Sequence, residues 1–245
     1  MNKHLSIAMF LLGACLALGF VYGMGKVSRA VAEFKRNNSI GVKGYAERRI
    51  TSDTASWSCT VTVREGQLQA GYARIKKDIE GCRQQMLTLG VTESELGLGP
   101  IQTEICHKRT ARGEETNEID YYDLTQNMRV SSKDVIKVDR VSKEITDLIA
   151  KGIEVRSGEV AFTSSQIEKA KLELIAEATQ NGRQRAEALA EQSKGKVGAL
   201  ISANQGVFQI VPVDSTEVSG AGIYDTTTVE KTVKAVVTLE FAVAQ

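Results

Sequence analysis

The sequence predicts an α+β fold: one or more mostly antiparallel sheets with packed amphipathic helices, preceded by one transmembrane helix. Three observations carry this prediction. Several segments rich in β-branched residues alternate apolar with polar positions, as half-buried strands do. Other segments repeat apolar residues every three or four positions, as one face of a helix does. The chain of 245 residues is 42% hydrophobic, which is enough for a real core, and it carries an uncharged run near its start.

That uncharged run extends from Leu5 to Gly25. About 20 helical residues cross the ~30 Å hydrocarbon layer of a bilayer, so residues 1–25 are expected to form a transmembrane anchor. A cleaved signal peptide is one alternative. A lipoprotein leader, suggested by "LGAC" at Leu12–Cys15, is another. Residues 26–38 are expected to form a membrane-proximal stalk, and residues 39–245 the folded domain.

The charges beside the run bear on its orientation. Lys26, Arg29, Lys35 and Arg36 follow the span, whereas Lys3 precedes it. By the positive-inside rule, this distribution favours a cytoplasmic C-terminal domain. It therefore opposes export of the domain.

The folded domain is expected to open with two strands, at 39–50 and 54–63, followed by a helix. Trp57, Cys59, Val61 and Val63 alternate with hydroxyl side chains in the second strand. From Gln67 to Leu89 apolar residues recur at helical spacing, and Gly90 is expected to end that helix. The apolar face of this helix comprises Leu68, Tyr72, Ile75, Ile79, Cys82, Met86 and Leu89.

A hairpin and a second helix are expected next. The segments 96–109 and 118–132 have strand character, and the charged segment 110–117 between them is typical of a turn. Ser132 is expected to cap the following helix, and Gly152 to end it. The apolar positions of that helix are Val135, Val138, Val141, Ile145 and Ile149.

One strand, one long helix and two closing strands complete the expected order, which is ββα-ββα-βα-ββ. The strand occupies 153–163, and the helix runs from Ser165 to Ser193. Closing strands are expected at 197–213 and 228–244. The small residues on the helix suggest that it lies flat against a sheet. Its apolar stripe comprises Ile167, Ala170, Leu174, Ala178, Gly182, Ala186 and Leu189.

Composition excludes several classes of function. Lys plus Arg number 31 and Asp plus Glu number 30, so no overall field attracts nucleic acid. His4 belongs to the leader, which leaves His107 as the domain's single imidazole and excludes a His-based metal cluster. No cofactor is expected. The acidic residues Glu114, Glu115, Glu118, Asp120 and Asp123 are most simply a solvated turn and its flanks.

The cysteines of the domain permit two interpretations. Cys59, Cys82 and Cys106 are buried small hydrophobes, or, in an oxidising space, they form one disulfide and one free thiol. Cys106 and His107 are neighbours on an expected strand, where adjacent side chains face opposite ways. A catalytic Cys–His pair would then need Cys59 or Cys82 to approach His107.

Glycines suggest close contacts of the backbone. "GVKG" at Gly41–Gly44 leads into a strand instead of a helix, so it does not fit a phosphate-binding loop. These glycines are expected to let the first strand bend or pass close to a neighbour.

Four segments, in order, resemble the SIMPL-domain family. They are "SIGVKGYAERRITSDTASWSCTVTV", "GVTESELGLGPIQTEI", the helix "KAKLELIAEATQNGRQRAEALAEQSKGKVGAL" after "VAFT", and the terminal "VKAVVTLEFAV". Ser52-Asp53 stands where the family often has Pro-Asp, and Asn181-Gly182 where it often has Asp-Ala. The resemblance covers about residues 39–245.

The resemblance implies a scaffold without established catalytic residues. Bacterial members include periplasmic immunogenic and oxidative-stress-defence proteins, and they tend to form large homo-oligomers. Gly41 and Gly44 belong to the structural signature. Within the long helix Ala186, Ala188, Leu189 and Ala190 are expected to pack, Gly195 to end the helix, and Gly198 to turn the chain into the next strand.

Two functions follow as expectations. The first is a non-enzymatic envelope protein, single-pass in the bacterial inner membrane, whose periplasmic domain assembles into a ring or cage and serves in envelope stress protection. Free sheet edges and the segment Asp214–Thr228 are the expected assembly surfaces. The alternative is a small-ligand-binding or thiol-redox protein that uses Cys59, Cys82 or Cys106.

Overall fold

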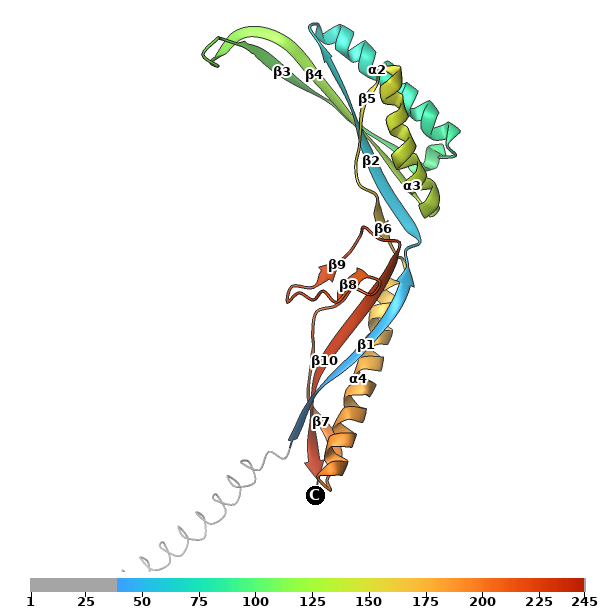
Figure 1. Cartoon of the computed structure of the whole chain (residues 1–245), viewed down its shortest axis with the longest axis vertical. Helices are drawn as coiled ribbons and strands as arrows, with labels where there is room; N and C mark the ends of the chain where they lie inside the picture. Colours follow the sequence, from blue (N-terminus) through green and yellow to red (C-terminus); the bar gives the residue numbers. More distant parts are fainter. Residues whose placement is uncertain (1–38, 245) are drawn as a thin grey trace, which may run out of the picture. The chain divides into compact units, whose positions relative to one another are not determined.

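The computed structural model describes residues 39–244. Within this range ten strands form two five-stranded sheets, accompanied by α-helices (Figure 1). The chain divides into two compact units. The first holds the described residues 39–45, 178–205 and 237–244, and the second holds 46–177 and 206–236. The fold is α+β with mainly antiparallel sheets, as the sequence predicts.

One sheet, here called the β2 sheet, lies in the second unit and has the order β3-β4-β2-β5, with β6 also paired to β2. All of its pairings are antiparallel. The predicted hairpin is confirmed as β3 and β4. The strands are β2 (Thr54–Glu65), β3 (Leu96–Arg109), β4 (Glu115–Ser132), β5 (Glu154–Ser157) and β6 (Ala161–Thr163).

The helices α2 (Leu68–Thr88) and α3 (Val135–Glu144) cover one face of this sheet (Figure 1). The prediction of α2 is confirmed, although its first turn is exposed: Leu68 and Tyr72 are open to solvent. The remaining apolar positions of α2 enter a core of large side chains. That core includes Trp57, Val61, Ile75, Met86, Leu124, Met128, Val138 and Ile145.

The start of α3 differs from the prediction that Ser132 caps it. Ser132 is still the last residue of β4, and its hydroxyl accepts a hydrogen bond from the Asp134 N–H at 3.0 Å. Asp134 is the N-cap, because its carboxylate accepts from the Lys137 N–H at 2.9 Å. The helix continues as a 3₁₀ turn, η2 (Ile145–Lys151), which ends at Gly152 with φ 83°. Ile149 is exposed, so it does not join the core.

The strand predicted at 153–163 is divided into β5 and β6. The Gly158 N–H donates to the Ser58 carbonyl at 2.9 Å between them, and a Cβ at Gly158 would come within 2.8 Å of that oxygen. A shorter 3₁₀ turn, η1 (Glu93–Glu95), precedes β3.

The other sheet, here called the β10 sheet, has the order β1-β10-β8-β9, with β7 also paired to β10. The predicted strand 197–213 is two strands, β7 and β8, which pair antiparallel with successive parts of β10. The segment expected to link the closing strands contains β9, which is parallel to β8. The strands are β1 (Ser39–Thr51), β7 (Lys196–Gln205), β8 (Gln209–Pro212), β9 (Ile223–Tyr224) and β10 (Glu230–Ala244).

The long helix α4 (Ile167–Gln192) contacts the sheet closely within the first unit. A Cβ at Gly44 would lie 1.9 Å from the Ala178 carbonyl oxygen, and one at Gly182 would lie 2.5 Å from Leu239 Cδ1. We call the contact formed by Gly44, Ala178, Gly182 and Leu239 the seam. The expectation that Gly44 passes close to a neighbour is confirmed, whereas a Cβ at Gly41 would meet nothing within 4 Å.

The end of α4 corrects three expectations. Leu189 is 56% exposed and Ala188 is also exposed, whereas Ala190 is 1% exposed, so the stripe passes from Ala186 to Ala190, four residues on. Lys194, with φ 58°, takes the left-handed conformation after the helix, and the Gly195 N–H donates to the Ala190 carbonyl. Gly198 lies inside β7, where a Cβ would come within 3.2 Å of the Ala242 carbonyl oxygen, so it permits a close strand contact and makes no turn.

Among the residues that the structure describes, no helix has the length and apolar character needed to cross a membrane. The predicted anchor 1–25 and stalk 26–38 lie outside the described residues.

Candidate functional site

Two of the three cysteines of the domain are core residues. Cys59 on β2 and Cys82 on α2 are buried, and both are free thiols. Burial raises the pKa of Cys59 to about 12 and that of Cys82 to about 11. Since the thiolate is the nucleophile, these two side chains are poorly suited to redox chemistry at neutral pH.

Cys106, by contrast, is partly accessible, and His107 follows it on β3. A β-bulge lies between these two residues: Cys106 pairs with Tyr121 and His107 pairs with Ile119. The extra residue of the bulge, Asp120, lies on β4, so the alternation of side chains is interrupted on β4 and continues on β3. Cys106 and His107 therefore face opposite sides of β3, as the sequence predicts.

Polar groups surround this Cys–His neighbourhood. His107 Nδ1 lies 3.7 Å from Glu115 Oε1, and the hydrogen bond with Cys106 raises the pKa of the Tyr121 phenol. The four residues line an open hollow of about 390 Å³. The thiol, imidazole and carboxylate types needed for a Cys–His mechanism are thus together on the hairpin of β3 and β4.

Two of the acidic residues of the hairpin form ion pairs with basic side chains. Lys108 Nζ lies 3.1 Å from Glu118, and Arg64 Nε lies 3.0 Å from Asp123. Within residues 39–244, no group of three or more His, Cys, Asp or Glu side chains is arranged to hold a metal ion.

A polar hollow of about 610 Å³ lies on the face of the β2 sheet opposite its helices. Its lining contains one charged side chain, Arg129, together with hydroxyl, amide and glycine positions. No carboxylate, imidazole or thiol joins this lining, so it offers no acid–base or nucleophilic set. The lining residues are Ser58, Thr60, Gly97, Leu98, Gly99, Asn127 and Arg129.

The segment Asp214–Thr228, expected as an assembly surface, is held by an internal network. Asp225 accepts from the Thr227 N–H at 2.9 Å and from the ammonium of Lys231, itself 1% exposed, at 3.2 Å. Burial opposes ionisation of Asp225, but hydrogen bonds from Thr228, Thr227 and Lys231 outweigh it and lower its pKa. Sequence reasoning missed this pair, because an acid and a base six positions apart in a polar segment give no sign of burial.

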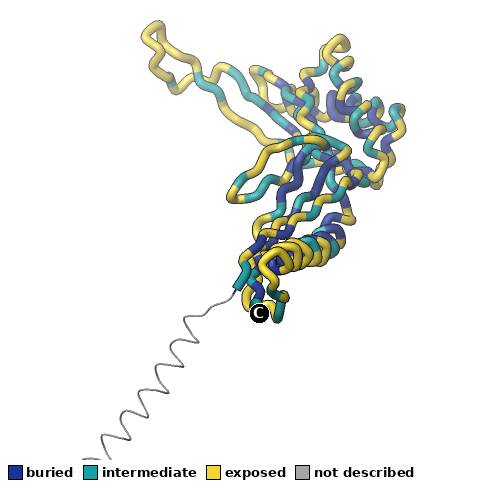
Figure 2. The backbone as a smooth tube through the Cα atoms, turned by 60° about the horizontal axis from the view of Figure 1, so that its bottom comes forward, coloured by how far each residue is buried: buried dark blue, intermediate teal, exposed yellow. Residues whose placement is uncertain are grey.

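The strongest candidate for an interaction surface is the edge strand β7. Every residue from 199 to 205 is exposed (Figure 2), including Leu200 at 48% and Ile201 at 57%. No charged residue or proline occurs from Val197 to Gln205. In the described chain β7 pairs with β10 alone, so one row of its backbone groups has no strand partner there. Such a row is a template for pairing with another strand.

The comparisons with known proteins assign the chain to a family. The comparison with curated proteins gave no match. A family model described as "SIMPL: Protein of unknown function (DUF541)" matches residues 40–241, which covers most of the chain and nearly all of the described part. The protein therefore belongs to the SIMPL family.

Proposed function

We propose that this protein is a non-enzymatic, membrane-anchored protein of the bacterial cell envelope whose SIMPL domain assembles into a large ring- or cage-like homo-oligomer. Residues 1–25 would hold it in the inner membrane, with the domain in the periplasm. Envelope stress protection is the role that the family resemblance favours. The proposal therefore combines an anchor read from the sequence with an assembly surface on the domain.

The observation that carries the assembly is the bare edge of β7. Folded proteins usually protect long edge strands with charged residues, prolines, bulges or a covering segment. The register of β7 against β10 shifts at two places. The strand nevertheless presents nine uncharged residues, Val197–Gln205, with two half-exposed aliphatic side chains at the middle. A strand of this kind is stabilised when a partner strand covers it. Tethering to a membrane raises the local concentration of the chain, so a second copy is the partner that is most readily supplied.

The mass of the full-length protein tests the assembly. Extracted in mild detergent, it should form discrete oligomers larger than a dimer by native mass spectrometry and light scattering. A strictly monomeric protein at every concentration would contradict the proposal.

The intact mass tests the anchor separately. The uncharged run Leu5–Gly25 should remain on membrane-extracted protein, so the mass should correspond to an unprocessed N-terminus. A chain that begins at Cys15 or Glu33 would show that the leader is cleaved.

A thiol-redox role at Cys106 is the second candidate, and its partial exposure at a hollow that His107 and Glu115 also line favours it. In the simplest step the Cys106 thiolate attacks hydrogen peroxide: an S–O bond forms, the O–O bond breaks, hydroxide leaves, and the thiol is oxidised to a sulfenic acid. Burial alone protects Cys59 and Cys82 from oxidation. A faster oxidation of Cys106 than of these two cysteines would therefore not show that His107 assists.

The decisive comparison is between the folded protein and its His107→Ala variant. If the imidazole assists, mass spectrometry should show Cys106 oxidised several-fold more slowly in the variant. Equal rates would leave Cys106 as an ordinary accessible thiol. Lys108→Ala, which leaves the Cys–His–Glu set intact, is the matched control.

A further inference from the structure

Within the first unit, the two outer strands of the β10 sheet differ in whether side chains hydrogen-bond to their outer edges. β1 and β7 each pair with β10 in the described chain, and neither has a second strand partner there along residues 39–45 or 196–205. A ring made by head-to-tail strand pairing would need both edges, because β7 of one copy would join β1 of the next. The state of the β1 edge therefore decides which assembly is available.

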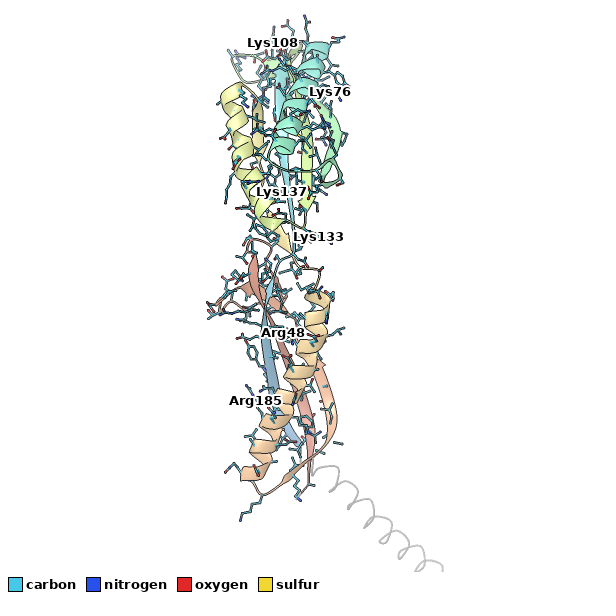
Figure 3. All side chains as sticks on the ribbon, turned by 90° about the vertical axis from the view of Figure 1, so that its right-hand side faces the viewer. Arg48, Lys76, Lys108, Lys133, Lys137 and Arg185 are labelled. Carbon is cyan, nitrogen blue, oxygen red and sulfur yellow. The ribbon has the colours of Figure 1, made fainter. Side chains whose placement is uncertain are left out.

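Side chains of α4 already occupy the edge of β1. Arg185 Nη1 donates to the Lys43 carbonyl at 3.1 Å, and Asn181 Oδ1 accepts from the Tyr45 N–H at 3.1 Å. Figure 3 labels Arg185 on α4. Backbone groups of residues two apart point to the same edge of a strand. Since β1 borders β10 on one side only, these bonds lie on its outer edge.

The edge of β7 has no comparable cover in the described chain. Its side-chain hydrogen bond, Ser202 Oγ to Glu240 at 3.3 Å, runs inward to β10. A second strand could therefore dock on β7 without displacing a side chain, whereas docking on β1 would break two hydrogen bonds to α4.

We propose that two copies of this protein join through antiparallel pairing of β7 with β7, about a two-fold axis that passes near Leu200 and Ile201. This rests on the proposed self-assembly and specifies its contact. The two-fold contact uses the same bare edge on both partners and leaves the α4–β1 bonds intact. It makes one continuous sheet across two copies and covers the most exposed aliphatic residue of each strand.

The symmetry has a strict consequence for register. A two-fold axis places the residue nearest to it opposite its own copy. The register of β7 against β10 shifts at Ile201, which has no partner on β10, so this self-opposed residue is located by cross-linking and not by alternation of faces. A β7 joint also ends at two copies, which means that any larger assembly uses a second surface elsewhere.

Charge substitution tests the joint in the full-length protein. Ile201→Lys places like charges next to each other across the axis and should reduce the mass of the assembly to half or less, with little change in thermal stability. Ile149→Lys is the matched control, because Ile149 is also aliphatic and also 57% exposed. It should leave the mass unchanged.

Cross-linking tests the register. Single cysteines at positions 199–203, in a chain with Cys15 and Cys106 replaced by Ser, should include one that forms a disulfide with its own copy, since opposed Cα atoms fall within disulfide range. Cross-links only between a β7 cysteine and Lys43→Cys would instead show head-to-tail pairing.

The outcomes separate the two proposals. If the wild-type protein is oligomeric but Ile201→Lys keeps its mass and no same-residue cross-link forms, the β7 joint is wrong while self-assembly stands. If the wild-type protein is monomeric at every concentration, the proposed function fails first and the joint fails with it.

Discussion

The seam and the core of the β2 sheet attach helices to strands by opposite means. At the seam, glycines on β1 and α4 let backbone touch backbone, and a Cβ at Gly44 would overlap the Ala178 carbonyl. In the core, side chains as large as Trp57 and Met86 fill the space between helices and sheet. A close contact between backbones tolerates no added side-chain atom. A core of side chains tolerates substitutions that keep the volume, but not substitutions that reduce it.

The largest effect is expected from adding atoms to the seam. Gly44→Val would force its side chain into the Ala178 carbonyl and the Gly182 N–H, which are backbone groups and cannot move aside. The cost should exceed about 4 kcal/mol and remove the fold of the first unit. Thermal unfolding followed by circular dichroism measures this. Gly41→Ala, where no atom lies within 4 Å, should change stability by less than about 1 kcal/mol.

If Gly44→Val unfolds at the same temperature as Gly41→Ala, the strand does not lie against α4 as described.

Removing volume from the core should have the next largest effect. Met86 is fully buried on α2, so Met86→Ala should cost about 2–5 kcal/mol in urea unfolding, while Met86→Leu should cost less than about 1.5 kcal/mol. Equal losses for the two variants would show that the core requires the shape of methionine and not merely its volume. Tyr72→Ala, on the exposed first turn of the same helix, is the matched control.

The contrast also explains which parts of the fold the sequence predicts well. The large residues of α2 mark its buried face unambiguously from Ile75 onward. At the end of α4, Leu189 is the most hydrophobic candidate, yet the buried position is Ala190. Where the partner is a backbone, the buried face carries small residues, and a hydrophobicity pattern cannot distinguish them from exposed ones.

The candidate sites depend on pairing, which a single sequence does not contain. The meeting of Cys106 with Tyr121 and of His107 with Glu115 follows from the pairing of β3 with β4, and that pairing has no local signal in the residues of β3. The strand character of β7 is predictable from its residues. Its position at an edge, and the closure of β1 by Asn181 and Arg185, exist only after the chain has folded.

A pH-dependent effect of intermediate size is expected in the second unit, where an ion pair joins η1 to α3. Glu95 on η1 lies 2.8 Å from the ammonium of Lys137 on α3. Burial disfavours the carboxylate, but hydrogen bonds from Lys137, Ser132 and Thr92 outweigh it and lower the pKa of Glu95 to about 2. A depressed carboxyl pKa stabilises the fold above the unfolded value of about 4.3, and that stability is lost as the pH falls toward 2.

The free energy of unfolding, measured with urea, should therefore be lower at about pH 3 than at about pH 6. This decrease should be about 1–3 kcal/mol larger in the wild-type protein than in Lys137→Met, whose Glu95 lacks its main partner. The same acid sensitivity in both proteins would assign it to other carboxylates. Arg185 donates to the Lys43 carbonyl, a group that does not titrate, so Arg185→Gln should leave the slope with pH unchanged.

The smallest effect is expected at Leu189, where the sequence predicts packing and the structure places the side chain in solvent. Leu189→Lys removes no buried contact and adds a cation near the C-terminal end of α4, where the helix dipole favours positive charge. Thermal unfolding should shift by no more than about 0.5 kcal/mol. Ala190→Lys is the matched change one residue later, and it would bury an ammonium in a site that is 1% exposed. A large loss of stability in Leu189→Lys with a small loss in Ala190→Lys would contradict the described orientation of α4. It would mean that the helix is rotated by one residue, about 100°, and that the seam involves other residues.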